Sequence, residues 1–72
     1  MVAVRIRRLR RHLGLTQAAF GKALGVSRDV ISNYENGRAM PRQVFLQLAC
    51  RVFGASEPWL LYGEGDLQAV VN

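Results

Sequence analysis

Apolar residues recur along this chain at three- and four-residue steps, the spacing that gathers them on one face of an α-helix. Together with helix start and stop signals, the pattern marks five segments at about residues 4–13, 17–24, 28–36, 41–53 and 57–62. Thr16, Ser27 and Ser56 precede three of them, where a hydroxyl side chain can cap free N–H groups. Pro41 suits the first turn of the fourth helix, because proline lacks only an N–H that is unpaired there. With no segment assigned to a strand, the sequence predicts an all-α, five-helix fold.

The second and third segments meet at Gly25, where we expect a left-handed turn. Their apolar positions repeat on both sides of this glycine, so that each helix buries one face in a common core: Phe20, Leu24, Val26, Val30, Ile31 and Tyr34. Four polar residues are left over: Arg28, Asp29, Ser32 and Asn33. They form a surface of hydrogen-bond donors and acceptors of the kind that contacts base edges. The layout is typical of a helix-turn-helix that reads DNA.

The charge is unevenly distributed along the chain. Residues 1–51 hold all ten lysines and arginines but only two acidic residues, a formal charge of +8, whereas residues 52–72 hold three acidic residues, a charge of −3. A basic region that contains the helix-turn-helix favours nucleic-acid binding. Anionic membranes and acidic proteins would also be attracted to it.

Length and composition exclude several function classes. The 72 residues make one domain, which we place at residues 1–66 with a short tail at 67–72. His12 and Cys50 are the single histidine and cysteine, so we expect no catalytic pair, no metal site and no cofactor, and therefore no enzyme. The sequence has neither the roughly 20 consecutive apolar residues of a membrane span nor a secretory signal, which predicts a cytoplasmic protein without a membrane partner.

Further motifs flank the two central helices. They run from Leu9-Arg10 through Gly14-Leu15-Thr16-Gln17 to Leu24-Gly25-Val26-Ser27, Ile31-Ser32, Glu35-Asn36-Gly37-Arg38, Pro41 and finally Trp59-Leu60-Leu61-Tyr62-Gly63-Glu64-Gly65. In these motifs the chain closely resembles the Cro/CI-type (lambda repressor-like) helix-turn-helix family over about residues 6–65. The resemblance implies a compact five-helix domain that binds a pseudo-palindromic operator as a dimer, with its third helix in the major groove.

Two departures from the family pattern affect the expected structure. Gly21 stands at a small position where the family commonly has alanine, which lets the third helix approach closely at a cost of roughly 1 kcal/mol in helix propensity. Tyr34 stands where the family is typically aliphatic, and we expect it at the edge of the surface without a special role.

The predicted base contacts lie at the start and along the exposed side of the third helix: Ser27, Arg28, Asp29, Ser32 and Asn33. Arg28 can donate twice to guanine, Asn33 can pair with the edge of adenine, and Asp29 can accept from cytosine or orient Arg28. The alternative for Arg28 and Asp29 is a solvated ion pair. The predicted phosphate contacts flank this helix, and their alternative is ordinary solvated loop residues: Gln17, Asn36, Arg38 and Arg42.

Two further sets of residues have structural roles. By resemblance to the family, Arg10 pairs with Glu35, whereas the remaining arginines of the first helix are expected to form a solvated face: Arg5, Arg7, Arg8 and Arg11. The fourth helix carries more apolar residues than one buried face needs. We therefore consider a dimer interface near the C-terminal half, formed by Phe45, Leu48, Val52 and Trp59, to which the tail at 67–72 can also contribute. The alternative is that the fifth helix and the tail cover this second stripe.

Together these features predict a sequence-specific transcriptional regulator, a repressor that occupies a double-stranded DNA operator as a homodimer. The alternatives are an antitoxin, which binds a toxin protein and regulates its own gene, and a restriction-modification controller.

Overall fold

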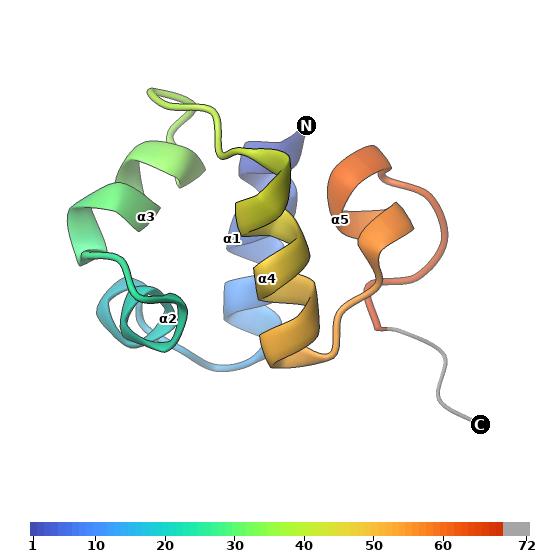
Figure 1. Cartoon of the computed structure of the whole chain (residues 1–72), viewed down its shortest axis with the longest axis horizontal. Coiled ribbons are helices and arrows are strands. Elements are labelled where there is room, and N and C mark those ends of the chain that lie inside the picture. Colours follow the sequence, from blue (N-terminus) through green and yellow to red (C-terminus); the bar gives the residue numbers. More distant parts are fainter. Residues whose placement is uncertain (69–72) are drawn as a thin grey trace.

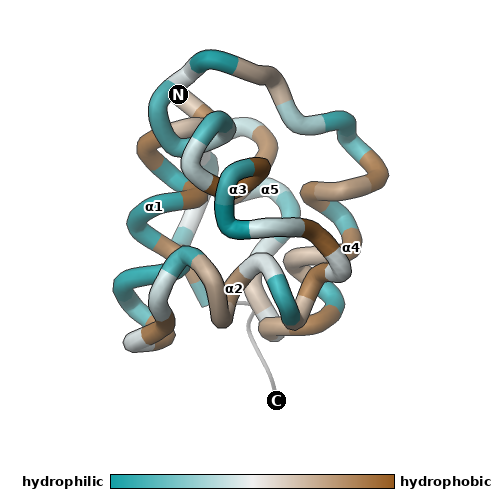
Figure 2. Tube along the Cα trace, turned by 90° about the vertical axis from the view of Figure 1, so that its left-hand side faces the viewer, coloured by the Kyte–Doolittle hydropathy of each residue, from teal (hydrophilic) through white to brown (hydrophobic). Residues whose placement is uncertain are grey.

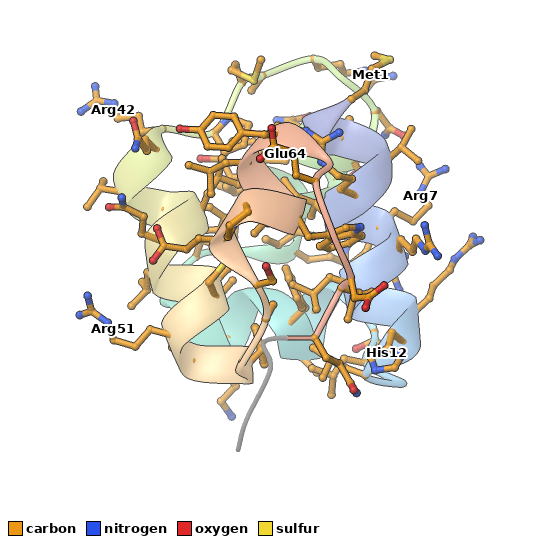
Figure 3. All side chains as sticks on the ribbon, turned by 90° about the vertical axis from the view of Figure 1, so that its right-hand side faces the viewer. Met1, Arg7, His12, Arg42, Arg51 and Glu64 are labelled. Carbon is orange, nitrogen blue, oxygen red and sulfur yellow. The ribbon has the colours of Figure 1, made fainter. Side chains whose placement is uncertain are left out.

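The computed structural model describes residues 1–68, which contain five α-helices and no strand. The helices are α1 (Val2–His12), α2 (Gln17–Leu24), α3 (Arg28–Glu35), α4 (Gln43–Phe53) and α5 (Glu57–Tyr62). Helices α2 and α3 form one end of the molecule and α5 the other, with α1 and α4 between them (Figure 1). Seen from the α5 end, α1 and α4 lie on opposite sides (Figure 3). The predicted all-α, five-helix fold is confirmed.

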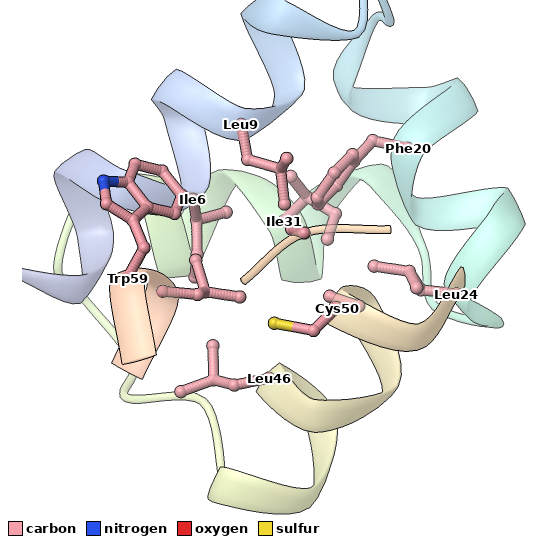
Figure 4. Close-up of a cluster of buried hydrophobic side chains, with 11 residues drawn as sticks. Ile6, Leu9, Phe20, Leu24, Ile31, Leu46, Cys50 and Trp59 are labelled. Carbon is pink, nitrogen blue, oxygen red and sulfur yellow. The ribbon is translucent and has the colours of Figure 1, made fainter. Parts of the chain in front are cut away.

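One hydrophobic core joins all five helices. Its buried members are Ile6, Leu9, Phe20, Leu24, Ile31, Leu46, Ala49, Cys50, Ala55, Trp59 and Leu60. Figure 4 shows these side chains converging between the helices, and Figure 2 shows teal and brown stretches alternating along the tube, as expected of helices with one buried face. Burial raises the pKa of the Cys50 thiol to about 11, which fits the core role expected for this residue.

The predicted capping residues hold the helix starts. Thr16 Oγ1 accepts from the N–H of Ala19 at 3.0 Å, and Ser27 Oγ accepts from the N–H of Val30 at 3.3 Å. Ser56 Oγ does the same for Trp59 at 3.4 Å. Gly25 ends α2 with a φ of 77°, the left-handed conformation that the sequence predicted for it.

The placement of Pro41 was wrong. Helix α4 begins at Gln43, and its N-cap is Arg42, whose backbone is extended with φ −72° and ψ 155°. Pro41 precedes the helix and is buried. Because proline suits a turn before a helix as well as the first helical turn, its presence alone did not fix the start.

The segment after α5 returns to the core. The backbone N–H of Ser56 donates to the carbonyl of Leu67 at 3.0 Å, and Ala55 pairs with Gln68 in an isolated antiparallel bridge. Leu67 packs against the core cluster. Leu67 and Gln68, which the sequence analysis placed in the tail, therefore contact the folded domain. The rest of that tail, residues 69–72, lies outside the described residues.

Gly21 is required by the close approach of α2 and α3. A Cβ at this position would lie 2.7 Å from the carbonyl oxygen of Val26 and 3.2 Å from Cγ1 of Ile31. We expect Gly21→Ala to lower the free energy of unfolding by about 1–2 kcal/mol, because the backbone clash outweighs the better helix propensity of alanine. Urea unfolding measures this, with Ala23→Gly on the exposed side of α2 as the control for propensity alone. A more stable Gly21→Ala variant would contradict the close approach.

Candidate nucleic-acid interface

Helix α3 has one buried and one open side. Ile31 and Glu35 face the interior, with exposed fractions of 0% and 5%. Five polar residues lie on the opposite side, exposed except for the half-buried Ser32: Arg28, Asp29, Ser32, Asn33 and Asn36. We call these five residues the α3 outer face. Helical geometry places them on one continuous surface, because positions three and four residues apart are neighbours.

Arg28 and Asp29 form an ion pair at the start of this face. Arg28 Nη2 lies 3.3 Å from Asp29 Oδ1, with side chains 62% and 82% exposed. An ion pair this open adds little to stability, so it costs little to break. The solvated ion pair considered as an alternative is thus present in the free protein, and both side chains remain accessible.

Glu35 is the centre of a hydrogen-bond network that joins α1, α2 and α3. Its side chain is 0% exposed. Arg10 donates from Nε to Oε2 at 2.6 Å and from Nη2 to Oε1 at 3.0 Å, which is the ion pair that the family resemblance implied. Gln17 Nε2 and Arg7 Nε donate to Oε1 at 3.2 and 3.3 Å. The end of α3 is therefore fixed to α1 and to the first turn of α2.

The donors around Glu35 determine its ionisation. Burial by itself would raise the pKa of the Glu35 carboxyl, but the hydrogen bonds from Arg10, Gln17 and Arg7 outweigh it, and the pKa is lowered from its ordinary value of 4.5. The hydrogen bond to Glu35 raises the pKa of Arg10 against the opposing effect of burial. The pair is thus fully ionised at neutral pH.

This lowered pKa predicts how stability depends on pH. A carboxyl whose pKa is lower in the folded chain stabilises the fold above the ordinary value of 4.5, and this contribution disappears as the pH falls through the folded-state pKa. We expect the free energy of unfolding to fall steadily below about pH 4.5. Urea unfolding between about pH 3 and pH 7 measures this. Asp29→Asn removes an exposed carboxylate from the same helix, and its free energy of unfolding should fall with pH as that of the natural chain does. A free energy of unfolding that stayed constant down to about pH 3 would contradict the role of Glu35.

Two arginines of α1 are not the solvated side chains that the sequence suggested. Arg7 donates to Glu35 and, from Nη2, to Asn36 Oδ1 at 3.2 Å. Arg5 donates to the carbonyl oxygens of Leu60 and Leu61 at 2.9 and 3.1 Å, which fixes α5 to α1. Arg8 and Arg11 are exposed, as expected. Arg7 lies three residues before Arg10, and this spacing was the signal that both could reach Glu35.

The predicted phosphate contacts differ in how free they are. Gln17 is half-buried, and its amide is engaged by Glu35. Asn36 is exposed, accepts from Arg7, and donates from Nδ2 to Ser32 Oγ at 3.3 Å. Arg38 lies in the turn after α3 and Arg42 at the start of α4, and both are exposed.

Two of the four residues predicted for a dimer interface are engaged within the chain. Trp59 is only 5% exposed, since it fills the core between α1 and α5. Phe45 is half-buried and meets Tyr34 edge-on with ring centroids 5.1 Å apart. Leu48 and Val52 are open, at 39% and 47%, and Val44, which the sequence analysis missed, is 70% exposed. These three residues follow one another at four-residue steps and form an apolar stripe on α4.

Residues 1–68 contain neither a metal-binding cluster nor a membrane span. No group of three or more His, Cys, Asp and Glu side chains in this range is arranged to hold a metal ion. In the same range, none of the helices has the length and apolar character needed to cross a membrane.

Comparison with known proteins identifies the architecture. A family model described as a helix-turn-helix domain matches residues 2–60. The chain belongs to the helix-turn-helix family. Within it, the P22 c2 repressor, solved in complex with a synthetic operator, superposes with a TM-score of 0.78 at 34% identity, covering 89% of this chain and 97% of that chain. The expected resemblance to lambda repressor-like proteins is thereby confirmed.

Two curated relatives are longer than this chain. The HTH-type transcriptional regulator DicA of Escherichia coli is 34% identical over 67 residues, which are 93% of this chain and 50% of DicA. The antitoxin PezA of Streptococcus pneumoniae is 34% identical over 56 residues, which are 78% of this chain and 35% of PezA. The chain thus spans half the length of the first relative and about a third of the second.

Proposed function

We propose that this chain is a sequence-specific DNA-binding domain of a transcriptional regulator, a repressor that acts in the cytoplasm on a pseudo-palindromic operator. The observation that carries the proposal is the α3 outer face, a continuous polar surface on a helix whose other side is fixed to the core through Ile31 and Glu35. Ser27, Arg28, Asp29, Ser32 and Asn33 contact base edges in the major groove, and Gln17, Asn36, Arg38 and Arg42 contact phosphates. The likeness to an operator-bound repressor supports this assignment.

The phosphate contacts predict a change in salt dependence. Arg38→Ala and Arg42→Ala should each make the negative slope of log affinity against log salt shallower by about one unit. With one phosphate contact fewer, DNA binding releases fewer counterions. Fluorescence anisotropy of a labelled duplex across a salt series measures the slope. Arg51→Ala is the matched control, since Arg42 and Arg51 lie at opposite ends of α4 (Figure 3). Equal slopes in all three variants would contradict the assignment of Arg38 and Arg42.

The proposal includes a homodimer formed through the apolar stripe of Val44, Leu48 and Val52. A two-fold dimer matches two half-sites about one helical turn apart, and the stripe offers the exposed apolar surface that such a contact needs. Sedimentation of the protein bound to a duplex selected from a random DNA library tests this. We expect two copies per duplex for the natural chain and one for Leu48→Glu. Val4→Glu, at a similarly exposed apolar position of α1, should leave two copies. One copy of the natural chain per duplex would contradict the dimer.

An antitoxin is the second candidate function, and the similarity to PezA is the observation that favours it. Under this alternative the natural protein, purified from its own cells, carries a second protein in fixed proportion. Purification of a tagged copy, followed by mass spectrometry, distinguishes the two: we expect no such companion protein, and a stoichiometric one would favour the antitoxin.

A further inference from the structure

A chain of hydrogen bonds runs from α1 to the middle of the α3 outer face. Arg7 donates from Nε to Glu35 Oε1 at 3.3 Å and from Nη2 to Asn36 Oδ1 at 3.2 Å. Asn36 in turn donates from Nδ2 to Ser32 Oγ at 3.3 Å. Of the residues that these hydrogen bonds connect, only Ser32 is one of the predicted base contacts.

The direction of each bond in this chain is fixed by chemistry. A guanidinium donates only and has no acceptor, so the Asn36 atom that faces Arg7 must be the oxygen. The amide nitrogen then faces Ser32, and Ser32 Oγ must accept from it. Among residues 1–68 the Ser32 hydroxyl makes no other hydrogen bond, so its own proton remains available to a group outside the protein.

Arg7 is held firmly enough to impose this direction. The carboxylate that it contacts is completely buried and is fixed by Arg10 and Gln17 independently of Arg7. The Arg7 side chain itself is 41% exposed and lies outside the core. Its loss therefore leaves Glu35 paired with Arg10 while it frees the Asn36 amide to rotate.

We propose that Arg7 is a positioning residue for DNA recognition, which keeps the Ser32 hydroxyl proton free to donate toward the bases by orienting Asn36. In the major groove the acceptors are N7 and O6 of guanine, N7 of adenine and O4 of thymine, whereas cytosine presents the N4 amino donor. With Asn36 held in this direction, Ser32 keeps its hydroxyl proton free for such an acceptor. With the amide reversed, Asn36 Oδ1 would take that proton and leave Ser32 only lone pairs, which suit the amino group of cytosine. This inference rests on the proposed function and concerns one base position of each half-site.

The test compares base preferences after selection from a random duplex library. Ser32→Ala first identifies the position that Ser32 reads, as the one whose base preference changes. Arg7→Ala should relax the same position by about threefold to tenfold, the range expected for one hydrogen bond, and leave the other positions unchanged. The double variant should show no further loss there. Arg11→Ala, which removes an equal charge from the exposed side of α1, should weaken all sequences alike.

Asn36→Asp tests the direction of the bonds. The new carboxylate accepts from Arg7 and also from the Ser32 hydroxyl, whose proton then points inward and whose lone pairs face the bases. We expect weaker binding to every sequence, because a negative charge is added near the phosphates, together with a shift toward cytosine at the Ser32 position. A loss of stability alone cannot produce such a shift.

The outcomes separate this inference from the proposed function. If the natural chain selects a motif but Arg7→Ala leaves the Ser32 position unchanged, or Asn36→Asp does not move it toward cytosine, the role of Arg7 is overturned while DNA reading stands. The role is also overturned if Ser32→Ala alters no position. If the natural chain enriches no motif, the proposed function itself fails.

Discussion

Glu35→Ala is expected to lower the free energy of unfolding by about 3–5 kcal/mol, because it removes the acceptor from a buried ion pair and leaves Arg10 without its partner. Arg10 is only 13% exposed, and two of its nitrogens donate to Glu35. A domain of this length has a total stability of about 4–11 kcal/mol. The variant should therefore lose a large share of its stability, and any loss of DNA binding should follow from the unfolding.

Circular dichroism during urea unfolding measures this loss. Asp29→Ala is the matched control, since it removes an exposed carboxylate from the same helix and should change stability little. An unchanged melting temperature for Glu35→Ala would contradict the structural role of the pair. A variant that remained folded and lost only DNA binding would instead assign Glu35 to the interface.

Arg28→Ala is expected to weaken binding to the selected operator by about 1–3 kcal/mol and to relax the preference at one base pair. The Arg28 side chain is 62% exposed, and its ion pair with Asp29 breaks at little cost. Two of its N–H donors can then contact O6 and N7 of one guanine. Anisotropy titrations with the selected site and with single-base variants of it measure the change.

Arg28→Lys separates the base contact from simple charge. Lysine keeps the positive charge but lacks the planar pair of donors, so it should retain the salt dependence and lose most of the base preference. If Arg28→Ala lowered affinity equally for all sequences, Arg28 would be a phosphate contact. If it changed nothing, the ion pair with Asp29 would be its entire role.

Local signals in the sequence predicted most of the fold. Thr16, Ser27 and Ser56 marked the helix starts because a hydroxyl cap acts within three residues of its own position. Gly25 marked the turn between α2 and α3 because glycine adopts the left-handed conformation that ends α2 without steric cost. The α3 outer face followed in the same way, since a helix with one apolar side must expose the other.

Contacts between distant residues were harder to predict. The periodicity of α1 placed its arginines around an apolar stripe, but it could not show that Arg5 reaches the last carbonyls of α5 or that Arg7 reaches Asn36. Trp59 was assigned to a surface because a large apolar residue near the C-terminal half suits either a core or an interface. Only the three-dimensional arrangement of α1 against α5 decides between the two.

Selection of bound sites from a random duplex DNA library, at near-physiological salt, tests the central claim most directly. We predict a two-fold symmetric motif with half-sites about one helical turn apart, enriched by the natural chain. Binding that depends on salt but enriches no motif would contradict the claim, since it would mean that the basic surface contacts the DNA backbone alone.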